Sequence, residues 1–233
     1  MLPCRGWPVS LLTDAYSRIP QPELADDAEL FVAAAEQALL EFRQLVRARY
    51  TEGTLCRLLH SCDSPIARRA AALALGMIGT FASNPALADA LRDEDAGVPL
   101  VAADALWDVW HRGDSEEQAR ELRAALSLFD FAERLAALDD VAMRFPDFAE
   151  ALNQRAIVRF GRGQYAKAAA DCEAVLRLNP VHFGAASGLG QCRLRMNKPT
   201  AALRAFVHAL EINPTLAHLR EAVSELRARL GEE

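Results

Sequence analysis

Three prolines that recur at a fixed interval constrain this chain more than any other feature. Pro146, Pro180 and Pro214 lie 34 residues apart, and each follows a run of residues with helical spacing. Because proline fixes φ and lacks a backbone N–H, it ends a helix at the same point of every unit. A constant period of this length predicts an array of stacked helical hairpins.

Small residues recur within these units where the two helices of a hairpin must approach each other. Ala156 lies with Ala168 in one unit, and Gly190 lies with Ala202 in the next. The remaining apolar positions are expected to fill the space between hairpins. They are Tyr165, Val175, Leu176, Leu189, Phe206, Ala209 and Leu210. The chain shows no sustained alternation of apolar and polar residues, so we predict an all-α fold, an α–α superhelix of helical hairpins.

The units resemble the tetratricopeptide repeat (TPR) family, whose pattern places a large residue, Leu-Gly, Tyr, Ala, Phe, Ala and Pro at set offsets. Residues 149 to 214 carry the resemblance as two units. The matching residues are Leu152, Ala156, Tyr165, Ala168 and Pro180, then Leu189, Gly190, Ala202, Phe206, Ala209 and Pro214. The resemblance implies repeats that bind other proteins and do not catalyse reactions.

Two flanking segments extend the array. A more decayed unit covers about residues 115 to 146, with the large residues Phe131 and Leu138 in place and Arg134 where the small alanine belongs. Residues 216 to 230 combine apolar residues at helical spacing with many charges. That combination is typical of a solubilising cap on an open array end.

A weaker repetition lies upstream. Five positions recur at an offset of 31 residues: Ala71, Ala72, Ala74, Leu75 and Ile78 match Ala102, Ala103, Ala105, Leu106 and Val109. Turn-forming stretches precede the two runs, and Asp63 or Ser64 in the first and Asp95 in the second supply capping oxygens. These short alanine-rich helices resemble HEAT-like repeats.

The patterns divide the chain into three segments. Residues 1–50 are predicted to be an N-terminal helical capping segment, with a Pro-rich entry (Pro3, Pro8, Pro20, Pro22) and a helix from about 23 to 50. Residues 51–113 form the HEAT-like helical repeats, and residues 114–233 form the TPR array with its C-terminal capping helix. The expected buried residues of the first long helix are Leu30, Leu39, Phe42 and Val46.

The boundary between the two repeat types is expected at a glycine, Gly113, followed by an N-cap candidate, Asp114. Trp107 and Trp110 precede this break. Large aromatic side chains dominate core burial, so we interpret both as core residues. The alternative is a surface hot spot for binding.

Composition and charge restrict the compartment and the partners. No apolar run is long enough to span a bilayer, and the first residues lack a signal-like apolar core, so we expect a cytoplasmic protein that does not enter a membrane. The net charge of −6 disfavours nucleic acid. The arginines of the first third, such as Arg43 and Arg47, are interrupted by Glu41, Glu52 and Asp63.

Five cysteines, an odd number at irregular spacing, do not indicate a disulfide framework. Cys172 and Cys192 are expected inside repeat helices as small buried residues. Cys56, His60 and Cys62 are the one candidate metal cluster. A structural zinc site needs four ligands, and no second Cys or His pair lies nearby, so we expect no metal and no cofactor.

We interpret the chain as a non-catalytic interaction module, an adaptor or assembly scaffold that holds a peptide or protein segment in a helical-repeat groove. It contains no phosphate-binding loop, nucleophile elbow or paired zinc-binding histidines, so no catalytic residue is assigned. By resemblance, the groove residues on a solvent-exposed concave face are Asn153, Ile157, Phe160, Ser187, Gln191, Leu194 and Arg195.

Three alternatives stay open. The groove positions can instead be an ordinary solvated helix face, and the HEAT-like face near Arg68 and Arg69 is a second candidate binding surface. The third alternative, which rests on the HEAT-like resemblance, is an accessory factor of a cofactor-attaching, lyase-like enzyme system. A chromophore or metal that co-purifies would favour the accessory, and a co-purifying polypeptide would favour the adaptor.

The first testable prediction concerns the candidate metal cluster. Purified protein is expected to contain far less than one equivalent of zinc, because Cys56, His60 and Cys62 lack a fourth ligand. Elemental analysis and thermal unfolding with and without a chelator measure this. Tightly held stoichiometric zinc, with unfolding on chelation, would contradict it.

Overall fold

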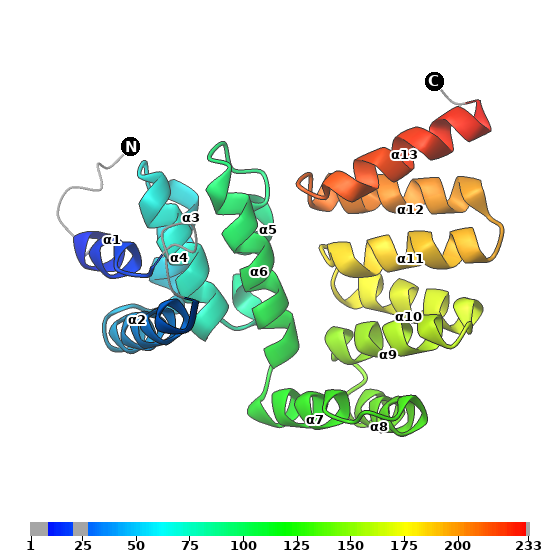
Figure 1. Cartoon of the computed structure of the whole chain (residues 1–233), viewed down its shortest axis with the longest axis horizontal. Coiled ribbons are helices and arrows are strands. Elements are labelled where there is room, and N and C mark those ends of the chain that lie inside the picture. The colour runs from blue at the N-terminus through cyan, green and yellow to red at the C-terminus, as the bar shows by residue number, and fades with distance from the viewer. Residues whose placement is uncertain (1–8, 21–27, 232–233) are drawn as a thin grey trace. The chain divides into compact units, whose positions relative to one another are not determined.

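The computed structural model describes residues 9–20 and 28–231, and the described residues form thirteen α-helices and one 3₁₀ turn (Figure 1). The all-α prediction is confirmed. The chain separates into two compact units, Met1–Val109 and Trp110–Glu233, which we describe one at a time. None of the described helices combines the length and the apolar character that crossing a bilayer requires.

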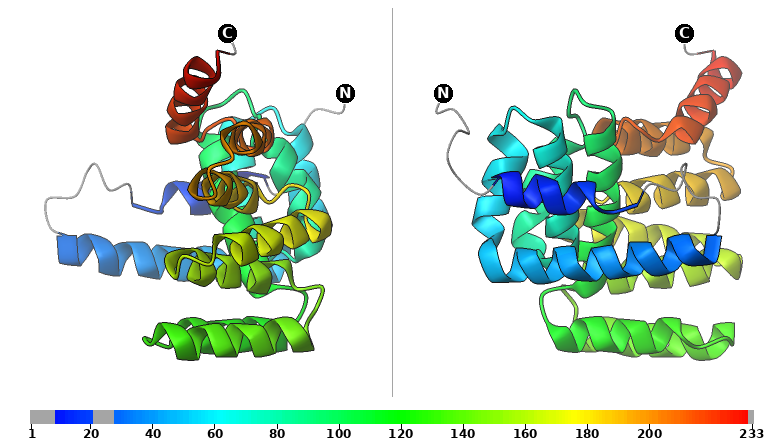
Figure 2. Two further views of the ribbon diagram at one scale, coloured as in Figure 1. Left: turned by 90° about the vertical axis from the view of Figure 1, so that its right-hand side faces the viewer. Right: turned by 60° about the vertical axis from the view of Figure 1, so that its left-hand side comes forward.

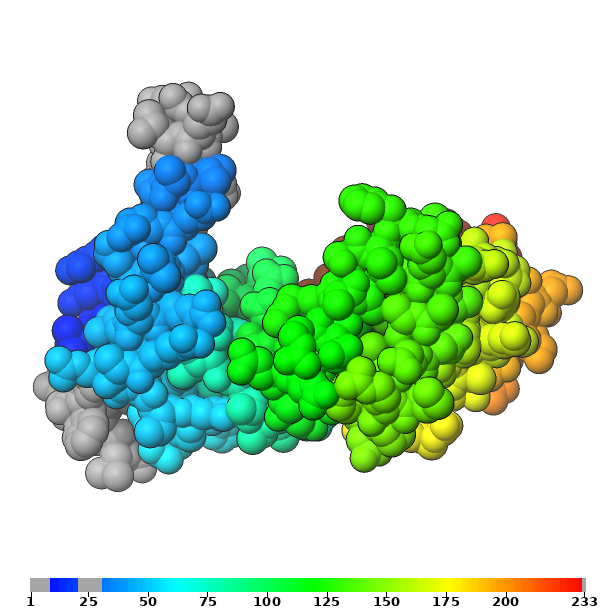
Figure 3. All heavy atoms as spheres, turned by 90° about the horizontal axis from the view of Figure 1, so that it is seen from below, coloured from blue at the N-terminus to red at the C-terminus, as the bar shows by residue number. Residues whose placement is uncertain are grey.

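Unit 1 begins with two helices that lie side by side (Figure 2). Its elements are α1 (Val9–Ser17), α2 (Ala28–Arg49), α3 (Glu52–Ser61), α4 (Pro65–Ile78), the 3₁₀ turn η2 (Phe81–Ser83), α5 (Asn84–Ala90) and most of α6 (Gly97–Arg112). In α2, Phe42 and Val46 are fully buried as predicted, and Leu39 is half-buried. The first half of α2 projects from the body of the unit (Figure 3), which fits its mostly exposed side chains.

Several expectations for the N-terminal segment fall on residues that the structure does not describe. Residues 23–27 of the expected helix and the side chain of Leu30 lie outside the described residues, as do Pro3, Pro8 and Pro22. These expectations stay predictions.

The alanine-rich runs form helices as predicted. The run from Ala71 to Leu75 lies in α4, and the run from Ala102 to Val109 lies in α6. Most of their small side chains are buried. Ser64 caps α4 by accepting the N–H of Ala67, at 3.4 Å. The helices are thus confirmed, whereas their assignment to HEAT-like repeats stays a prediction.

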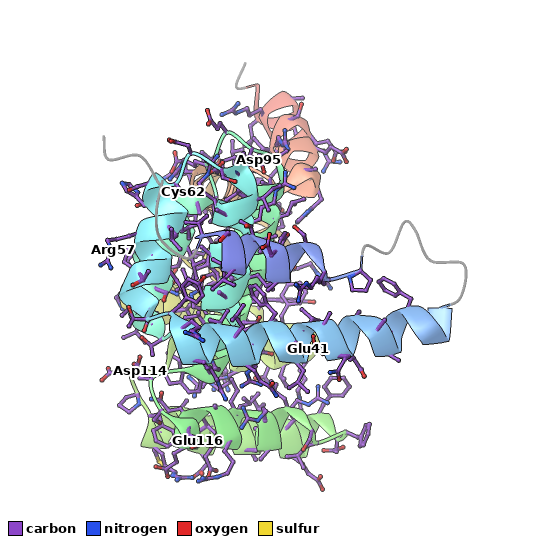
Figure 4. All side chains as sticks on the ribbon, turned by 90° about the vertical axis from the view of Figure 1, so that its left-hand side faces the viewer. Glu41, Arg57, Cys62, Asp95, Asp114 and Glu116 are labelled. Atoms are coloured by element: carbon purple, nitrogen blue, oxygen red, sulfur yellow. The ribbon has the colours of Figure 1, made fainter. Side chains whose placement is uncertain are left out.

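The expected basic face near Arg68 and Arg69 is not an open surface. Arg68 is buried, and its guanidinium donates to both carboxylate oxygens of Asp93, at 2.7 and 2.8 Å. Arg69 forms an equivalent fork with Asp95, at 2.7 Å for each bond. Arg68 also donates to the carbonyl of Cys62, which lies at the same end of the unit as Asp95 (Figure 4). Planar two-bond pairs of this kind fix geometry, so both arginines tie α4 to the loop before α6.

Unit 2 is a row of antiparallel helical hairpins. It begins with the last turn of α6 and contains α7 (Glu116–Leu126), α8 (Phe131–Arg144), α9 (Ala149–Gly161), α10 (Tyr165–Leu178), α11 (Phe183–Arg195), α12 (Pro199–Ile212) and α13 (Ala217–Leu230). Consecutive helices pack together along the row, and α9 also contacts α11. Figure 1 shows α9 to α12 stacked in this order.

The three prolines end their helices as predicted. Helices α8, α10 and α12 stop at C-caps Phe145, Asn179 and Asn213, one residue before Pro146, Pro180 and Pro214 in turn. Each C-cap N–H still closes the last turn, for example from Asn179 to the carbonyl of Val175 at 2.7 Å. Proline then prevents a further turn because it has no N–H to donate.

The small residues predicted at helix crossings are buried. Ala168 and Ala202 have no exposed surface. A Cβ on Gly190 would lie 2.3 Å from the ring of Phe206 in α12, a distance that no folded protein tolerates. Glycine is therefore required at this crossing, because the ring of Phe206 leaves no room for a side chain.

Two details of the first hairpin differ from expectation. Phe131 is exposed on the surface of α8 and is not a core residue; Leu138 and Val141 form the core there instead. Ser115, and not Asp114, caps α7 by accepting the N–H of Gln118. Arg134 occupies the position of the small alanine because its guanidinium donates to the carbonyl of Leu128 and closes the hairpin loop.

A substitution at Ala168 tests the packing of the hairpin. Ala168→Leu should lower the free energy of unfolding by roughly 1–3 kcal/mol, because the added atoms overpack a site with no free surface. Lys167→Ala, on the exposed side of the same helix, should change it by less than about 0.5 kcal/mol. Denaturant unfolding of both variants measures the difference, and equal losses would contradict the repeat register.

Candidate functional site

The predicted groove residues lie on two neighbouring helices of unit 2. Asn153, Ile157 and Phe160 follow one another at helical spacing along α9, and Ser187, Gln191 and Leu194 do so along α11. With Arg195 at the end of α11, we refer to these seven residues as the α9–α11 face. The contact between α9 and α11 brings the two sets together.

An arginine stacked on two aromatic rings joins the C-terminal ends of the two helices. The guanidinium carbon of Arg195 lies 4.7 Å from the ring centre of Tyr165 and 5.8 Å from that of Phe160. The two rings meet edge to face, with their centres 5.3 Å apart. The stack fixes the flat side of the guanidinium and leaves its N–H edge available to a hydrogen-bond acceptor.

Two large apolar side chains on the same face are open to solvent. Ile157 is 55% exposed and Leu194 is 39% exposed. Ile157 lies one turn before Phe160 on α9, and Leu194 directly precedes Arg195 on α11. Gln191 is exposed beside them, and Ser187 is half-buried.

Asn153 does not belong to the exposed part of this face, contrary to expectation. Its side chain is only 3% exposed, and its amide donates to the carboxylate of Glu150 at 3.2 Å. The same carboxylate accepts from Gln154 Nε2 at 2.6 Å and lies 3.0 Å from His182 Nε2 and 3.5 Å from His111 Nε2. A buried carboxylate with four polar neighbours has its lone pairs satisfied, so this end of the face is closed.

The hydrogen bonds of His182 define its tautomer. Its Nδ1 accepts the backbone N–H of Ala185 at 3.0 Å and thereby caps α11, so the proton of the neutral ring is on Nε2. This Nε2–H donates to Glu150. Trp110 stacks on the imidazole with ring centres 4.0 Å apart and also contacts Phe183. Trp110 is buried, which confirms its interpretation as a core residue, whereas Trp107 is half-buried.

The buried polar cluster was not predicted, although two signals for it exist in the sequence. Glu150 lies one turn before Asn153 on the same side of α9, and His182 directly precedes an apolar helix start, where polar N-cap residues are typical. Neither signal reveals that the two side chains meet, because they are 32 residues apart.

Ion pairs between arginine and aspartate side chains hold α9 on the opposite side of the helix. Arg155 and Arg159 both bind the buried carboxylate of Asp171 in α10, at 2.7 Å each. Both also reach Asp139 in α8, at 3.0 and 2.9 Å. The two arginines thus tie α9 to the helix before it and to the helix after it.

The polar cluster around Glu150 is closed to solvent. The side chains of Glu150 and His182 have no solvent exposure, so the pair cannot meet a substrate. Across residues 9–20 and 28–231, no three His, Cys, Asp or Glu side chains are grouped as a metal-ligand set. The exposed part of the α9–α11 face offers apolar area, an amide and a cation instead.

Burial and hydrogen bonding act in opposite directions on Glu150. Burial raises the pKa of this carboxyl, but the hydrogen bonds from His182 and Gln154 together lower the pKa below its ordinary value. A lowered pKa means that the ionised form stabilises the fold. This contribution is present above the ordinary glutamate pKa of about 4.3 and is lost as the pH falls below it.

Glu150→Gln tests the cluster. The NH₂ group of the new amide would face the N–H donors of His182, Gln154 and Asn153 and find no acceptor. The variant should therefore lose roughly 1–3 kcal/mol of unfolding free energy at pH 7. The gap to wild type should shrink as the pH falls below the ordinary glutamate pKa of about 4.3, because the unfolded wild-type chain then takes up a proton that the folded chain binds only at lower pH. Denaturant unfolding at several pH values measures the gap, with Glu221→Gln on the exposed side of α13 as the control. A gap that does not change with pH would contradict this account.

Comparisons with known proteins agree with the repeat geometry. A family model described as "Tetratricopeptide repeat" matches residues 159–230. A TPR repeat-containing protein of Rhizobium etli is 36% identical over 94 residues, which are 40% of this chain and 46% of that protein. Superkiller complex protein 3 of Mus musculus is 30% identical over 120 residues, 51% of this chain and 8% of that protein.

The chain therefore spans less than half the length of the first of these relatives and under a tenth of the second. A solved structure entitled "First TPR of Spaghetti (RPAP3) bound to HSP90 peptide SRMEEVD" superposes with a TM-score of 0.48 at 20% identity, covering 51% of this chain and 96% of that one. The family match shows a tetratricopeptide repeat region in residues 159–230, and the Rhizobium relative is a repeat protein to which part of this chain is similar.

Proposed function

We propose that this protein is a non-catalytic adaptor or assembly scaffold that binds a peptide or protein segment on the exposed part of the α9–α11 face. The observation that carries the proposal is the exposure of Ile157 and Leu194 beside the stacked guanidinium of Arg195. Arginine is enriched among the residues that dominate binding energy, and exposed apolar side chains near it add area that a partner can cover.

The energetic contributions of these groups differ. Covering Ile157 and Leu194 contributes at most about 1.5–3 kcal/mol each, since both are already partly buried. The described residues include no carboxylate within ion-pair distance of Arg195, so a carboxylate of the partner can take that place. Ser187 and Gln191 can hydrogen-bond to the backbone of an extended segment. The family's lysine- and asparagine-based clamp for a terminal carboxylate is not reproduced, because Ile157 replaces its asparagine.

The partner is a polypeptide of unspecified identity in this proposal, and nucleic acid, a membrane and a cofactor are not expected. The family match supports a binding role without catalysis. The HEAT-like assignment of residues 51–113, the division into segments 1–50, 51–113 and 114–233, and the cytoplasmic location stay predictions. The accessory role in a cofactor-attaching system rests only on that HEAT-like assignment.

A triple variant tests the proposed function. Ile157→Ala, Gln191→Ala and Arg195→Ala together remove apolar area, an amide and the cation from exposed positions, so the core is unaffected. Asn153 is kept, because its loss would disturb Glu150. Affinity for a partner identified by cross-linking should fall at least tenfold, about 1.4 kcal/mol. Titration of the partner's binding segment measures the affinity.

Arg229→Ala, on the exposed side of α13, is the control, and thermal unfolding should give closely similar curves for all three proteins. Unchanged affinity in a folded triple variant would reject the α9–α11 face. The exposed surfaces of α3 and α4 would then be the next candidates.

A further inference from the structure

Two cysteines of successive repeats meet inside unit 2. Cys172 lies in α10, the last helix of one repeat, and Cys192 lies in α11, the first helix of the next. The side chains are 2% and 1% exposed and belong to one apolar cluster with Ala168, Ala169 and Ala185. Burial at these positions confirms the prediction from sequence. Their closeness is an additional feature that the repeat pattern does not require.

The contact is set by Gly188, one turn before Cys192. The sulfur of Cys172 lies 3.4 Å from the point where a Cβ of Gly188 would be, so it rests on the bare backbone of α11. Side chains of a helix lean toward its N-terminus. The sulfur of Cys192 therefore leans back toward Gly188, on the side of α11 where the sulfur of Cys172 lies.

The two thiols are chemically unequal. The neighbouring thiol of Cys172 lowers the pKa of Cys192, and although burial opposes this effect, the positive charge of Arg193 adds to it. The neighbouring thiol of Cys192 and burial raise the pKa of Cys172. Oxidation-sensitive pairs commonly combine one thiol that ionises readily with a second thiol that resolves the product.

From this geometry we propose that Cys172 and Cys192 form an oxidation site, a dithiol that hydroperoxides convert into a disulfide between α10 and α11. The repeat array then gains a covalent bond between two of its units. The proposal does not depend on the α9–α11 face, because both sulfurs lie on the inner side of their helices.

The chemistry balances with hydrogen peroxide as the oxidant. The thiolate of Cys192 attacks one peroxide oxygen, the O–O bond breaks, and Cys192 becomes a sulfenic acid while hydroxide leaves and takes up a proton to form water. The sulfur of Cys172 then attacks the sulfenic sulfur, an S–S bond forms, and a second water leaves. Two thiols are oxidised, one peroxide is reduced, and two waters form.

Burial makes this reaction slow and selective. Hydrogen peroxide is nearly as small as water, and it reaches the sulfurs when α11 separates locally from α10. Sulfenic acid that forms there is shielded from further peroxide and lies against its resolving thiol. The expected product is therefore the disulfide, with little sulfinic acid.

Peptide mapping of the full chain tests the proposal. The protein is treated with hydrogen peroxide, alkylated under denaturing conditions, digested with trypsin and analysed by mass spectrometry without reductant. Trypsin cleaves after Lys167, Arg177 and Arg193, so the two cysteines fall on separate peptides, 168–177 and 178–193. The expected result is a cross-linked pair of these peptides, two hydrogen atoms lighter than their sum, which dithiothreitol separates.

Cys172→Ser is the matched variant, since it removes only the resolving sulfur. Cys192 should then proceed to sulfinic acid or pair with a foreign thiol, and the cross-linked peptides should vanish. Half-buried Cys56 in unit 1 reports the dose of oxidant in every sample. If wild-type protein shows Cys56 oxidised but gives no 168–177/178–193 pair, or gives as much sulfinic acid at Cys192 as Cys172→Ser does, the proposal is wrong. The wild-type map alone decides this outcome if the variant does not fold.

Discussion

The close approach of helices at small residues is the constraint on which unit 2 depends. Because a Cβ on Gly190 would lie 2.3 Å from the ring of Phe206, the absence of one methyl group sets the separation of α11 and α12. Ala168 acts in the same way between α9 and α10. A fixed separation within each hairpin fixes where the next hairpin starts, and the proline at its end fixes the register.

The polar interior of unit 2 then determines which part of the α9–α11 face is exposed to solvent. Burying a carboxylate is unfavourable unless its lone pairs are satisfied. Glu150 meets this condition through His182, Gln154 and Asn153, which come from α9 and from the start of α11. The ion network of Arg155 and Arg159 with Asp171 holds α9 from the opposite side. Helix α9 is thus fixed on two sides before any partner binds.

Features of unit 2 that depend on period and residue size could be predicted from the sequence. Spacing alone predicted the helices, the helix ends before the three prolines, and the buried alanines. Spacing failed where a polar side chain pairs with a group inside the fold. Asn153 was expected in solvent but hydrogen-bonds to buried Glu150. Arg68 was expected on an open face but donates two hydrogen bonds to Asp93. Helical periodicity states which residues share a face, but it does not state which face a neighbouring element covers.

The two sides of α11 differ in the same way. Its inner side carries Gly188 and Cys192, where small residues admit the sulfur of Cys172, and its outer side carries Gln191, Leu194 and Arg195. The N-terminal part of the face is closed by the cluster around Glu150, so the binding that we propose uses α11 from Ser187 onward. Arg195 lies at the end of α11, where stacking on Tyr165 and Phe160 fixes the orientation of its guanidinium. A bound segment should therefore place apolar side chains over Ile157 and Leu194 and a carboxylate beyond them, at Arg195.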